Sequence, residues 1–454
     1  MPACARTSTV SGHFSTRSLF QGGTVFDVFV TTTAAAVGQS ILVLPTTLSR
    51  MGIWWGIAWQ IMFHSISTYT GYLLSMLYLE YCSISKQDEE APASGTSNVS
   101  TVQYDEVVGG LTSPQFGYLT RIMTTATLFG LATVQFIASS SNLYLVSSTL
   151  NKQQWTFVFG AITTCVVFLP SIGHYRALSI LGLLATTYTA IYLFWQALAN
   201  GQVDDVDLGG PQSATDFFEG SSDVIFTFSG HAMLIEVMFT MDEPAKFGRA
   251  FTFQWVYVMI VLTLPHSIAV WWAFGAETLA QHNAIALMPE SAARTLAAMM
   301  MVLHELVACG LFLVPLFTMA EKACAVHHEA EFFTRRVPVR LVVFGASWFV
   351  AIALPFFGPA NAVIGALLSS NITYMIPCAV HLWVYRTAKR RQACALQLWQ
   401  PRLAWPLMIA VNVFTIVLVT IMGFGFGSFY SIRAVVDEAS TFGIFQTCYE
   451  CGST

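Results

Sequence analysis

The feature that most constrains this chain is a series of apolar segments, each long enough to cross a lipid bilayer as an α-helix. About 20 apolar residues span the hydrocarbon core of a membrane. Only 10% of the 454 residues are charged and 55% are hydrophobic, whereas a soluble domain carries about 25% charged residues. We therefore predict an all-α integral membrane protein with eleven transmembrane helices in one membrane domain. The expected spans are residues 25–49, 53–82, 117–149, 155–171, 177–199, 217–241, 251–275, 295–320, 340–357, 361–385 and 403–427.

The distribution of Lys and Arg between the connecting segments predicts the orientation of these spans. Positively charged residues favour the cytosolic side of a membrane. With a cytosolic N-terminus, 16 of the 20 Lys and Arg residues lie on the cytosolic side and 4 lie outside. An odd number of spans then places the C-terminus outside. The four expected outside are Arg50, Lys152, Arg294 and Arg433, and the acidic loop 200–216 falls on the same side.

The eleven spans divide into two halves of five and one additional helix. Residues 25–199 and 217–386 each hold five spans. Because five is odd, the second half begins on the opposite side of the membrane from the first. Such inverted repeats are typical of transporters in which the first helix of each half is interrupted. The remaining parts are a cytosolic segment at 1–24, the eleventh span at 403–427 and an extracellular tail at 428–454.

Each half contains a glycine beside a polar side chain in the middle of its first span. Glycine weakens a helix, and unwound backbone within a membrane is tolerated where it lines a cavity. A single glycine of this kind is more often explained by close packing of helices, but two at matching positions favour a binding site. We therefore predict that spans 1 and 6 are interrupted, and that the breaks bind a substrate through Val37, Gly38, Gln39, Ser229, Gly230 and His231.

Ionisable side chains within the spans are candidates for proton coupling, because such groups are costly in a membrane and are functional candidates by default. His231 is the best placed, since it adjoins a predicted break and its unperturbed pKa of about 6.5 lets it change charge near neutral pH. Glu236 would point away from His231 by about 140° on a continuous helix, so we expect it to contact a neighbouring helix. His304 and Glu305 point about 100° apart and cannot share one cavity. The secondary candidates for proton coupling are Glu236, His304 and Asp27.

Amides and other histidines also lie deep within the spans. Gln135 and Asn142 are seven residues apart, which is two helical turns, so they share one face of span 3. Together with Gln39 in span 1, they either form hydrogen bonds between helices or line the polar wall of a substrate cavity. His64 and His266 could each be satisfied by a backbone carbonyl group, and Pro265 frees such a carbonyl near His266.

The chain lacks the sequence signatures of several other classes of protein. It has no nucleophile elbow, P-loop or His-Glu-x-x-His motif, which argues against an enzyme and against an ATP-driven pump. No basic tract with interleaved aromatic residues suggests nucleic-acid binding. Metal-ligand spacing is absent apart from Cys448-Tyr-Glu-Cys451, two cysteines that could form a disulfide on the outside. We therefore expect no metal and no cofactor, with a proton as the coupling ion.

Short motifs distributed along the chain carry a family resemblance. The motifs lie at 22–27, 39–45, 228–237, 244–247, 272–275, 282–289, 354–361, 423–427 and 441–451. They include Phe-Ser-Gly-His-Ala-Met-Leu-Ile-Glu-Val in span 6 and Thr-Phe-Gly-Ile-Phe-Gln-Thr-Cys-Tyr-Glu-Cys near the C-terminus. Together these segments resemble the plant auxin influx carriers of the amino acid/auxin permease family, and the resemblance covers nearly the whole chain from about residue 20.

The resemblance implies proton-coupled import of indole-3-acetic acid across the plasma membrane, on a LeuT-like fold of eleven spans. It also implies that Gln39 and His231 match the family's span-1 glutamine and span-6 histidine. The chain departs from the carriers at Ala35-Ala36, where they have Asn-Gln, and at Asp242-Glu243, where they have Trp-Lys. The first departure lies beside the predicted site and bears on substrate selectivity. We expect the chain to function as a monomer in the bilayer.

The hypothesis for the mechanism is that protonated His231 binds the substrate carboxylate from outside, together with free backbone N–H groups of the two breaks. Gln39, Gln135 and Asn142 would line the polar side of the cavity. Loss of the proton on the cytosolic side would then release the anion. Two alternatives remain: a symporter for an aromatic or neutral amino acid, and a receptor that binds its ligand without moving it.

Overall fold

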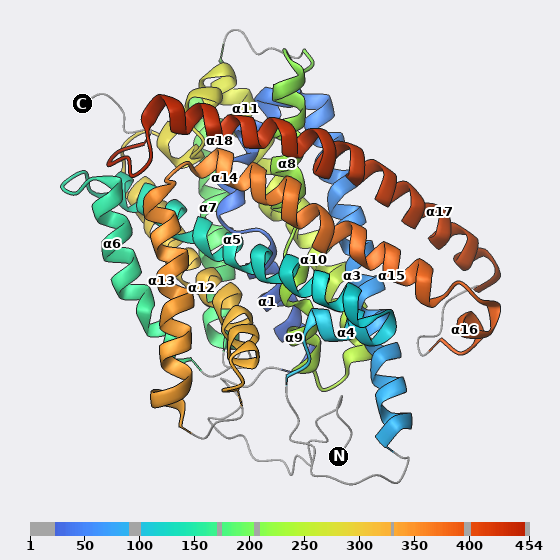
Figure 1. Cartoon of the computed structure of the whole chain (residues 1–454). Helices are drawn as coiled ribbons and strands as arrows, with labels where there is room; N and C mark the ends of the chain where they lie inside the picture. The colour runs from blue at the N-terminus through green and yellow to red at the C-terminus, as the bar shows by residue number, and fades with distance from the viewer. Residues whose placement is uncertain are drawn as a thin grey trace.

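Helices make up the regular structure of the chain in a computed structural model, which describes residues 23–89, 101–169, 175–203, 209–327, 331–394 and 401–449. No β-strand occurs among these described residues. Figure 1 shows that the helices gather into one bundle, with α17 and α18 crossing its upper part obliquely.

Eight of the described helices are long and apolar enough to cross a membrane. They contain between 22 and 39 residues, more than the about 20 that a bilayer requires. The protein is therefore a multi-pass helical membrane protein. The eight helices are Pro114–Val146, Ala177–Asn200, Ala214–Phe239, Pro244–Ala280, Ala292–Ala323, Phe332–Ala353, Phe357–Val384 and Ala404–Phe442. The other three predicted spans fall on α1 with α2, on α3, and on α6 with η3.

The first predicted span consists of three short pieces. Helix α1 covers Val25–Ala36, a 3₁₀ turn η2 covers Gln39–Leu42, and helix α2 covers Leu44–Met51. Between α1 and η2, Val37 (φ −128°, ψ 80°) and Gly38 (φ −104°, ψ −113°) leave the helical region. The chain thus crosses the middle of the bundle with a stretch of non-α-helical backbone.

The sixth predicted span is interrupted in a similar way. Helix α8 covers Ala214–Thr227, a 3₁₀ turn η5 covers His231–Met233, and helix α9 covers Leu234–Phe239. Gly230 separates them with φ 129° and ψ 0°. This positive φ is rarely adopted by a residue with a Cβ atom, so the glycine permits the chain to change direction here.

The other helices surround these two regions. Before α8 they are α3 (Ile53–Glu89), α4 (Tyr104–Leu111), α5 (Pro114–Val146), α6 (Lys152–Thr163) with η3 (Thr164–Phe168), and α7 (Arg176–Asn200). After α9 the first group is η6 (Pro244–Lys246), α10 (Phe247–Tyr257), η7 (Val258–Thr263), α11 (Leu264–Phe274), η8 (Gly275–Ala280), η9 (Ala284–Leu287) and α12 (Ala292–Ala323). The last group is η10 (Phe332–Arg336), α13 (Val337–Ala353), α14 (Phe357–Val363), η11 (Ile364–Met375), α15 (Ile376–Val384), α16 (Ala388–Gln392), α17 (Pro401–Val419), η12 (Thr420–Gly427) and α18 (Ser428–Phe442).

The C-terminal helix is longer than predicted. The eleventh span was expected to end at 427 and to be followed by a tail, but α17, η12 and α18 continue as helical structure to Phe442. Helix α18 is amphipathic and rests on α14 and α8, with Ser428 and Ser431 buried against them. Packing of this polar face extends the helix beyond the apolar segment, and Gly443 (φ 82°) ends it. The predicted segment at 1–24 lies outside the described residues up to 22, as does Cys451.

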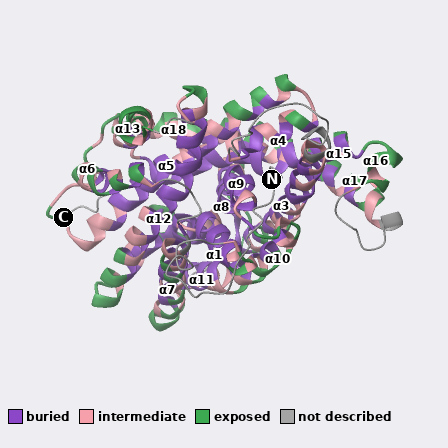
Figure 2. Ribbon diagram, turned by 90° about the horizontal axis from the view of Figure 1, so that it is seen from below, coloured by how far each residue is buried: buried purple, intermediate pink, exposed green. Residues whose placement is uncertain are grey.

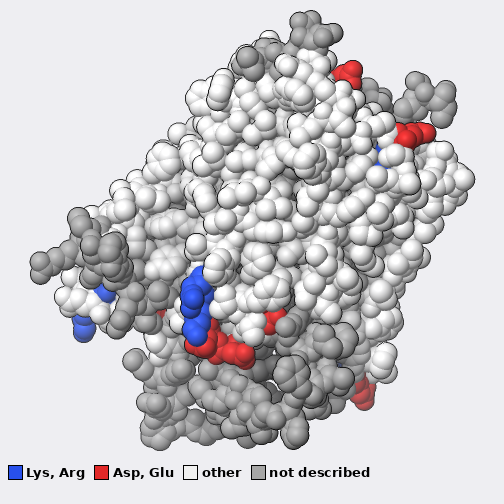
Figure 3. Space-filling view, turned by 180° about the vertical axis from the view of Figure 1, so that it is seen from behind, with Lys and Arg blue, Asp and Glu red and all other residues white. Residues whose placement is uncertain are grey.

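The surface of the bundle is apolar, as a protein in lipid requires. Figure 2 shows that the interior helices α1, α8 and α9 are buried while the outer faces of α13 and α7 are exposed. Large apolar side chains point outward, with Trp54 at 73% and Val342 at 72% exposure. Figure 3 shows a broad band of one face free of charged side chains. A lipid-facing surface of this kind is stable because the hydrocarbon core replaces water around it.

Candidate functional site

The interrupted regions of spans 1 and 6 lie against each other in the middle of the bundle. A Cβ atom at Gly230 would lie 3.8 Å from Cα of Ala36 and 3.9 Å from the carbonyl oxygen of Ala35. The first N–H groups and last C=O groups of a helix have no partner within that helix. Two helix ends therefore meet here with polar backbone groups that a ligand can use.

A small cavity lies between these breaks and the helices α5 and α12. It has room for about one water molecule, so the protein is closed around it and a larger ligand requires the helices to separate. Span 1 contributes the longest stretch of the lining. The lining residues are Ala35, Ala36, Gly38, Gln39 and Ser40 from span 1, Leu131 and Gln135 from α5, Phe226 and Ser229 from span 6, and His304, Ala308 and Phe312 from α12.

His304 is the titratable side chain of this cavity. Its Nδ1 lies 3.2 Å from the carbonyl oxygen of Gly182 and 2.8 Å from Oγ1 of Thr186. Because a carbonyl oxygen only accepts hydrogen bonds, Nδ1 carries the hydrogen and donates it. Nε2 is buried and has no hydrogen-bond partner among the described residues. The nitrogen left to gain or lose a proton is therefore the one on the side of Gly38, in the cavity.

Two further polar atoms of the lining have no partner within the described chain. The side-chain amide of Gln135 donates from Nε2 to the carbonyl of Leu131 at 3.3 Å, which leaves Oε1 as a buried acceptor without a donor. The hydroxyl of Ser40 is also buried and without a partner. Buried polar groups are normally hydrogen-bonded, so these two atoms and Nε2 of His304 are the groups that a polar ligand would satisfy.

Gln39 lines the cavity but is already paired. Its amide exchanges two hydrogen bonds with the amide of Asn361 on α14, at 3.4 Å and 3.3 Å. This pair joins the break of span 1 to the tenth predicted span. Sequence reasoning had no means of finding Asn361, because the contact joins residues 322 positions apart.

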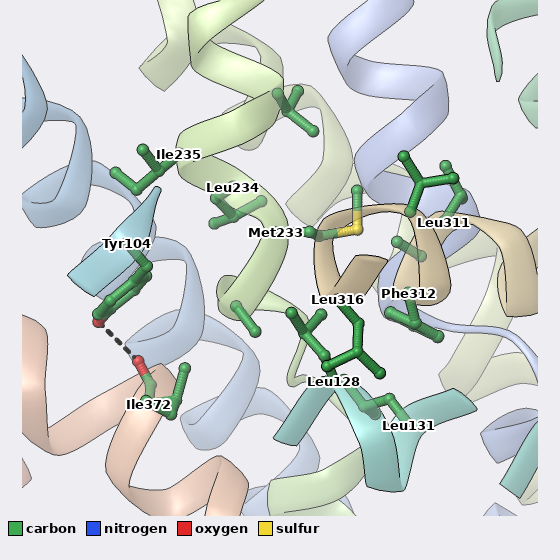
Figure 4. Packing of buried hydrophobic residues seen from close by; sticks show 14 of the residues in the cluster. Tyr104, Leu128, Leu131, Met233, Leu234, Ile235, Leu311, Phe312, Leu316 and Ile372 are labelled. Atoms are coloured by element: carbon green, nitrogen blue, oxygen red, sulfur yellow. Dashed lines mark hydrogen bonds between the residues drawn. The ribbon is translucent and has the colours of Figure 1, made fainter. Parts of the chain in front are cut away.

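The rest of the cavity wall is apolar, beside the polar groups on α5 and α12. Leu131 and Phe312 line it, and Figure 4 shows Leu128, Leu316 and Met233 beside them. Leu128 lies three residues from Leu131 and Leu316 lies four residues from Phe312, so each pair shares one helix face. All five side chains are nearly fully buried. These five side chains form an apolar layer on the side of the cavity that faces α4.

His231 lies outside the cavity, although it was predicted to be its central residue. Its Nε2 is 3.1 Å from the carbonyl oxygen of Ser67 and 3.1 Å from Oγ1 of Thr70, both on α3. The ring also packs edge-on against Phe251 on α10, at 6.0 Å between centroids. The 3₁₀ turn after Gly230 rotates this side chain away from the α5 and α12 side of the break. In this conformation His231 fastens η5 to α3.

Asn142 lies in a second polar network, away from the cavity. Its Nδ2 donates to Oε1 of Glu305 at 2.7 Å, and its Oδ1 accepts from Nδ2 of Asn283 at 2.8 Å. His304 and Glu305 therefore face different surroundings, in agreement with their angular separation on α12. Gln135 and Asn142 share a helix face, but only Gln135 lines the cavity.

The remaining candidates have structural contacts. Glu236 accepts a hydrogen bond from Nε2 of Gln103 at 3.0 Å, which joins span 6 to the residue before α4, a neighbouring-helix contact of the kind expected. Asp27 accepts from the backbone N–H groups of Gly23 and Thr24, each at 3.0 Å, and so caps the start of α1. The N–H of His266 donates to the carbonyl of Ile41 at 2.9 Å, which secures η2.

The structure thus brings together four of the predicted residues, Gly38, Gln39, Gln135 and Ser229, and leaves Val37, Asn142, Gly230 and His231 outside the lining. Val37 is fully buried where α1 ends. The residues that sequence reasoning missed or ranked low lie on α12. A signal for them exists, because His304, Ala308 and Phe312 are spaced four residues apart and so share one face.

Relatives of known description match the chain along most of its length. Residues 21–424 match the family described as transmembrane amino acid transporter protein. Auxin transporter-like protein 1 of Medicago truncatula is 38% identical over 434 residues, which are 95% of this chain and 89% of the relative. Auxin transporter protein 1 of Arabidopsis thaliana is 38% identical over 436 residues, covering 95% of this chain and 88% of the relative. These proteins are transporters and not enzymes.

Solved structures also match the fold of this chain. MhsT in complex with L-phenylalanine matches with a TM-score of 0.63 over 89% of this chain and 99% of that one, at 11% identity. The nucleobase-cation-symport-1 family transporter Mhp1 matches with a TM-score of 0.53 over 93% of this chain and 94% of that one, at 14% identity. At such identities the likeness shows the fold alone, which is LeuT-like. On the sequence matches, this chain belongs to the amino acid/auxin permease family, in the branch of the auxin transporter-like proteins.

Proposed function

We propose that this protein is a proton-coupled symporter that imports indole-3-acetic acid, as the anion with a proton, across the plasma membrane by alternating access. The observation that carries the proposal is the cavity at the two helix breaks, where His304 supplies one titratable nitrogen among otherwise neutral lining residues. An indole carboxylate has one acidic group and a flat apolar ring. The names of the relatives support this choice of substrate.

The membrane topology that fits this proposal has eleven spans and two inverted halves. The three regions outside the eight long apolar helices supply the remaining spans, and α1–η2–α2 and α8–η5–α9 begin the two halves. The uneven distribution of Lys and Arg then predicts that the end of the bundle with α4 faces the cytosol. It predicts that the loop containing His282 faces the outside. The cavity is too small for such a substrate in this conformation, so the surrounding helices must move apart during the cycle.

The energetics require a coupled proton. Moving an anion inward against an inside-negative potential costs about 2.3 kcal/mol per 100 mV. One accompanying proton cancels that cost, and each unit of pH difference adds about 1.4 kcal/mol. A histidine is suited to this task because its unperturbed pKa lies between the pH of an acidic exterior and that of the cytosol.

In this mechanism, His304 protonated at Nε2 binds the substrate carboxylate when the site is open to the outside. The donor groups at the start of η2 and η5 assist, because the N-terminal end of a helical segment favours an anion. Oε1 of Gln135 is placed to accept the indole N–H, and Leu131, Phe226 and Phe312 would enclose the ring. Release of the proton to the cytosol neutralises His304 and frees the anion.

His231 remains a second candidate for the proton-carrying group. To reach the cavity, its ring would have to give up the contacts with Ser67 and Thr70 on α3. Such a change is compatible with a movement of η5 against α3 during opening. The same proton requirement then applies to His231, and uptake by variants of the two histidines decides between them.

Uptake by proteoliposomes containing the purified full chain tests the proposal. With an outside pH about two units lower than inside, labelled indole-3-acetic acid should accumulate above its equilibrium level, and a protonophore should abolish the accumulation. Unlabelled indole-3-acetic acid should compete, whereas tryptophan should not. Saturable binding without accumulation would instead indicate a receptor.

A symporter for aromatic or neutral amino acids is the second candidate. The similarity of fold to MhsT, solved with L-phenylalanine, is compatible with it. Oε1 of Gln135 is an acceptor for the ammonium group of a zwitterion, but the lining residues include no carboxylate to balance that positive charge. Accumulation of labelled tryptophan or phenylalanine, without accumulation of indole-3-acetic acid, would favour this function over the first.

A further inference from the structure

A group of four ionisable side chains lies at the end of the bundle opposite α4. Arg50 at the end of α2 donates from Nη1 to Oε2 of Glu219 on α8 at 2.9 Å. The same nitrogen is 3.9 Å from Oδ2 of Asp223, one turn further along α8. Nη2 of Arg50 is 3.1 Å from Nε2 of His282, in the loop before η9. This cluster joins α2, α8 and the loop.

The cluster holds more acidic groups than one arginine can neutralise. Glu219 and Asp223 are 8% and 3% exposed, and neither carboxylate oxygen of Asp223 has a hydrogen-bond partner among the described residues. A buried ionised carboxylate without hydrogen bonds is unstable relative to its protonated form. Two carboxylates that share one cation titrate as a pair. The pair is therefore the place at which this cluster would take up a proton, and Asp223 is the member that is more buried and farther from Arg50.

His282 is the third side chain of the cluster that contacts Arg50. A guanidinium only donates hydrogen bonds, so Nε2 of His282 is the acceptor in its contact with Arg50 and carries no proton. Protonation of Asp223 or Glu219 would remove the negative charge that holds Arg50. Acidification thus weakens every charged contact that Arg50 makes within the cluster.

The neighbouring elements add other ionisable groups. Asp216, in the first turn of α8, and Glu438 on α18 both act on Glu219, and Tyr374 on η11 donates to the backbone carbonyl of Ile225 at 3.4 Å. The first two are acidic side chains, which increases the excess of acidic groups around Arg50. Tyr374 is uncharged at neutral pH.

The cluster lies directly beyond the cavity. Asp223 precedes Phe226 by three residues on α8, so the two side chains share one face, and Phe226 lines the cavity. Beside Glu219, a Cβ atom at Gly220 would lie 2.5 Å from Cγ of Met51 on α2. Helices α2 and α8 are thus in close contact at the level of the cluster, and they must separate before a substrate reaches the cavity from this side.

We propose that Asp223, Glu219, Arg50 and His282 form a proton-binding site separate from the cavity, and that a proton bound there from outside releases Arg50 and lets α2 separate from α8. The proposal rests on the proposed function for the direction of transport. It gives the transporter two places at which external acid acts: the cavity, where the proton accompanies the substrate, and this outer cluster, where it permits entry.

The variant Asp223→Asn tests the proposal, because the amide resembles the protonated acid in shape and charge. Above the pH at which half of the sites are protonated, the rate of a proton-dependent opening step falls by up to about tenfold per pH unit. In the variant, initial uptake should fall less steeply per pH unit than in the unchanged protein, because only the proton of the cavity then limits it, and uptake near neutral pH should be faster. Asp216→Asn is the matched control on the same helix, since Asp216 bonds to Ser213 at the exposed start of α8, and it should keep the normal pH profile.

A second measurement does not depend on transport. Ser40→Cys places a thiol in the cavity, and its labelling by a membrane-impermeant reagent from outside reports opening. The labelling rate at each pH is divided by the rate for a free thiol at the same pH. Labelling of the protein that lacks the Ser40→Cys substitution is subtracted. Acid should accelerate labelling in the single variant, whereas Ser40→Cys with Asp223→Asn should label rapidly at both pH values.

Unchanged pH profiles of uptake and labelling in Asp223→Asn would overturn the proposal and leave the proposed function intact. If the unchanged protein failed to accumulate indole-3-acetic acid, the proposed function would fail, but the labelling experiment would still decide whether the cluster controls opening. Slow labelling of the double variant at both pH values would also count against the outer site, provided that the protein reaches the membrane in normal amount.

Discussion

Spans 1 and 6 each contain a glycine where α-helical structure stops, and the surroundings of the two glycines differ. A Cβ atom at Gly38 would lie 1.9 Å from Nε2 of His304. At Gly230 the nearest atom would be 3.8 Å away, but φ is 129°. Gly38 is therefore required by the approach of another side chain, and Gly230 by its own backbone conformation. The same pattern in the sequence has two physical causes, and substitutions can separate them.

The largest effect is expected from Gly38→Ala. The new methyl group overlaps His304, whose ring is held at Nδ1 by Gly182 and Thr186, so either the ring or η2 must move. Overpacking of this kind costs about 1–3 kcal/mol, and displacement of the proposed proton-binding nitrogen should lower uptake by more than about 100-fold. Thermal unfolding and labelled uptake measure the two effects.

The double variant Gly38→Ala with His304→Ala is the control for this explanation. Removal of the ring creates space for the methyl group, so the midpoint of thermal unfolding should recover part of its loss, while uptake should not return. A double variant as unstable as Gly38→Ala alone would show that the backbone at Gly38, and not the overlap with His304, makes glycine necessary.

A second large effect is expected where the two histidines are compared directly. His304→Gln removes the titratable nitrogen from the cavity and should reduce pH-driven uptake by more than about tenfold. His231→Gln keeps a side chain that can donate to Ser67, so it should retain most of the uptake. His231→Ala removes that contact as well and should lower stability. The reverse order of uptake, with His231→Gln inactive and His304→Gln active, would restore His231 as the proton-carrying residue.

A smaller effect is expected from Gly230→Ala. A residue with a Cβ atom at this φ is strained by about 1–3 kcal/mol, but the space beside it is open, so the variant should fold with a lower unfolding midpoint and partial uptake. A second substitution, Ala36→Gly, at the residue whose Cα lies nearest to this position, should give no recovery. Recovery in that double variant would mean that crowding, rather than φ, limits this position.

Much of the architecture followed from the sequence, since long apolar segments and the positions of glycine are local properties. The apolar segments predicted the membrane helices, and Gly38 and Gly230 marked where helical structure stops. The direction of a side chain after a break is not local. His231 appeared to adjoin the cavity because it follows Gly230, but η5 directs it toward Ser67 and Thr70 on α3.

The partners of buried polar groups were equally beyond sequence reasoning. Asn361 pairs with Gln39 and Asn283 pairs with Asn142, and only the packing of distant helices brings them together. The preference for Asn142 as a cavity residue rested on its helical face, which is shared with Gln135. Position along the helix determines which of the two lines the cavity. Asn142 lies two turns further along α5 than Gln135, away from the breaks.

The smallest effect is expected from the side-chain pair that holds the break of span 1. This pair is Gln39 and Asn361. Their two hydrogen bonds are long, at 3.4 Å and 3.3 Å, so each contributes toward the lower end of about 0.5–1.5 kcal/mol. A double-mutant cycle of Gln39→Ala and Asn361→Ala, read by thermal unfolding, should give a coupling free energy in that range. The break of span 6 is fastened differently, because His231 contacts Ser67 and Thr70 on α3, while Ser229 donates to its own helix at Phe226. A coupling near zero would mean that break 1, unlike break 6, is held by backbone conformation and close packing alone, and that Gln39 is free to turn toward a substrate.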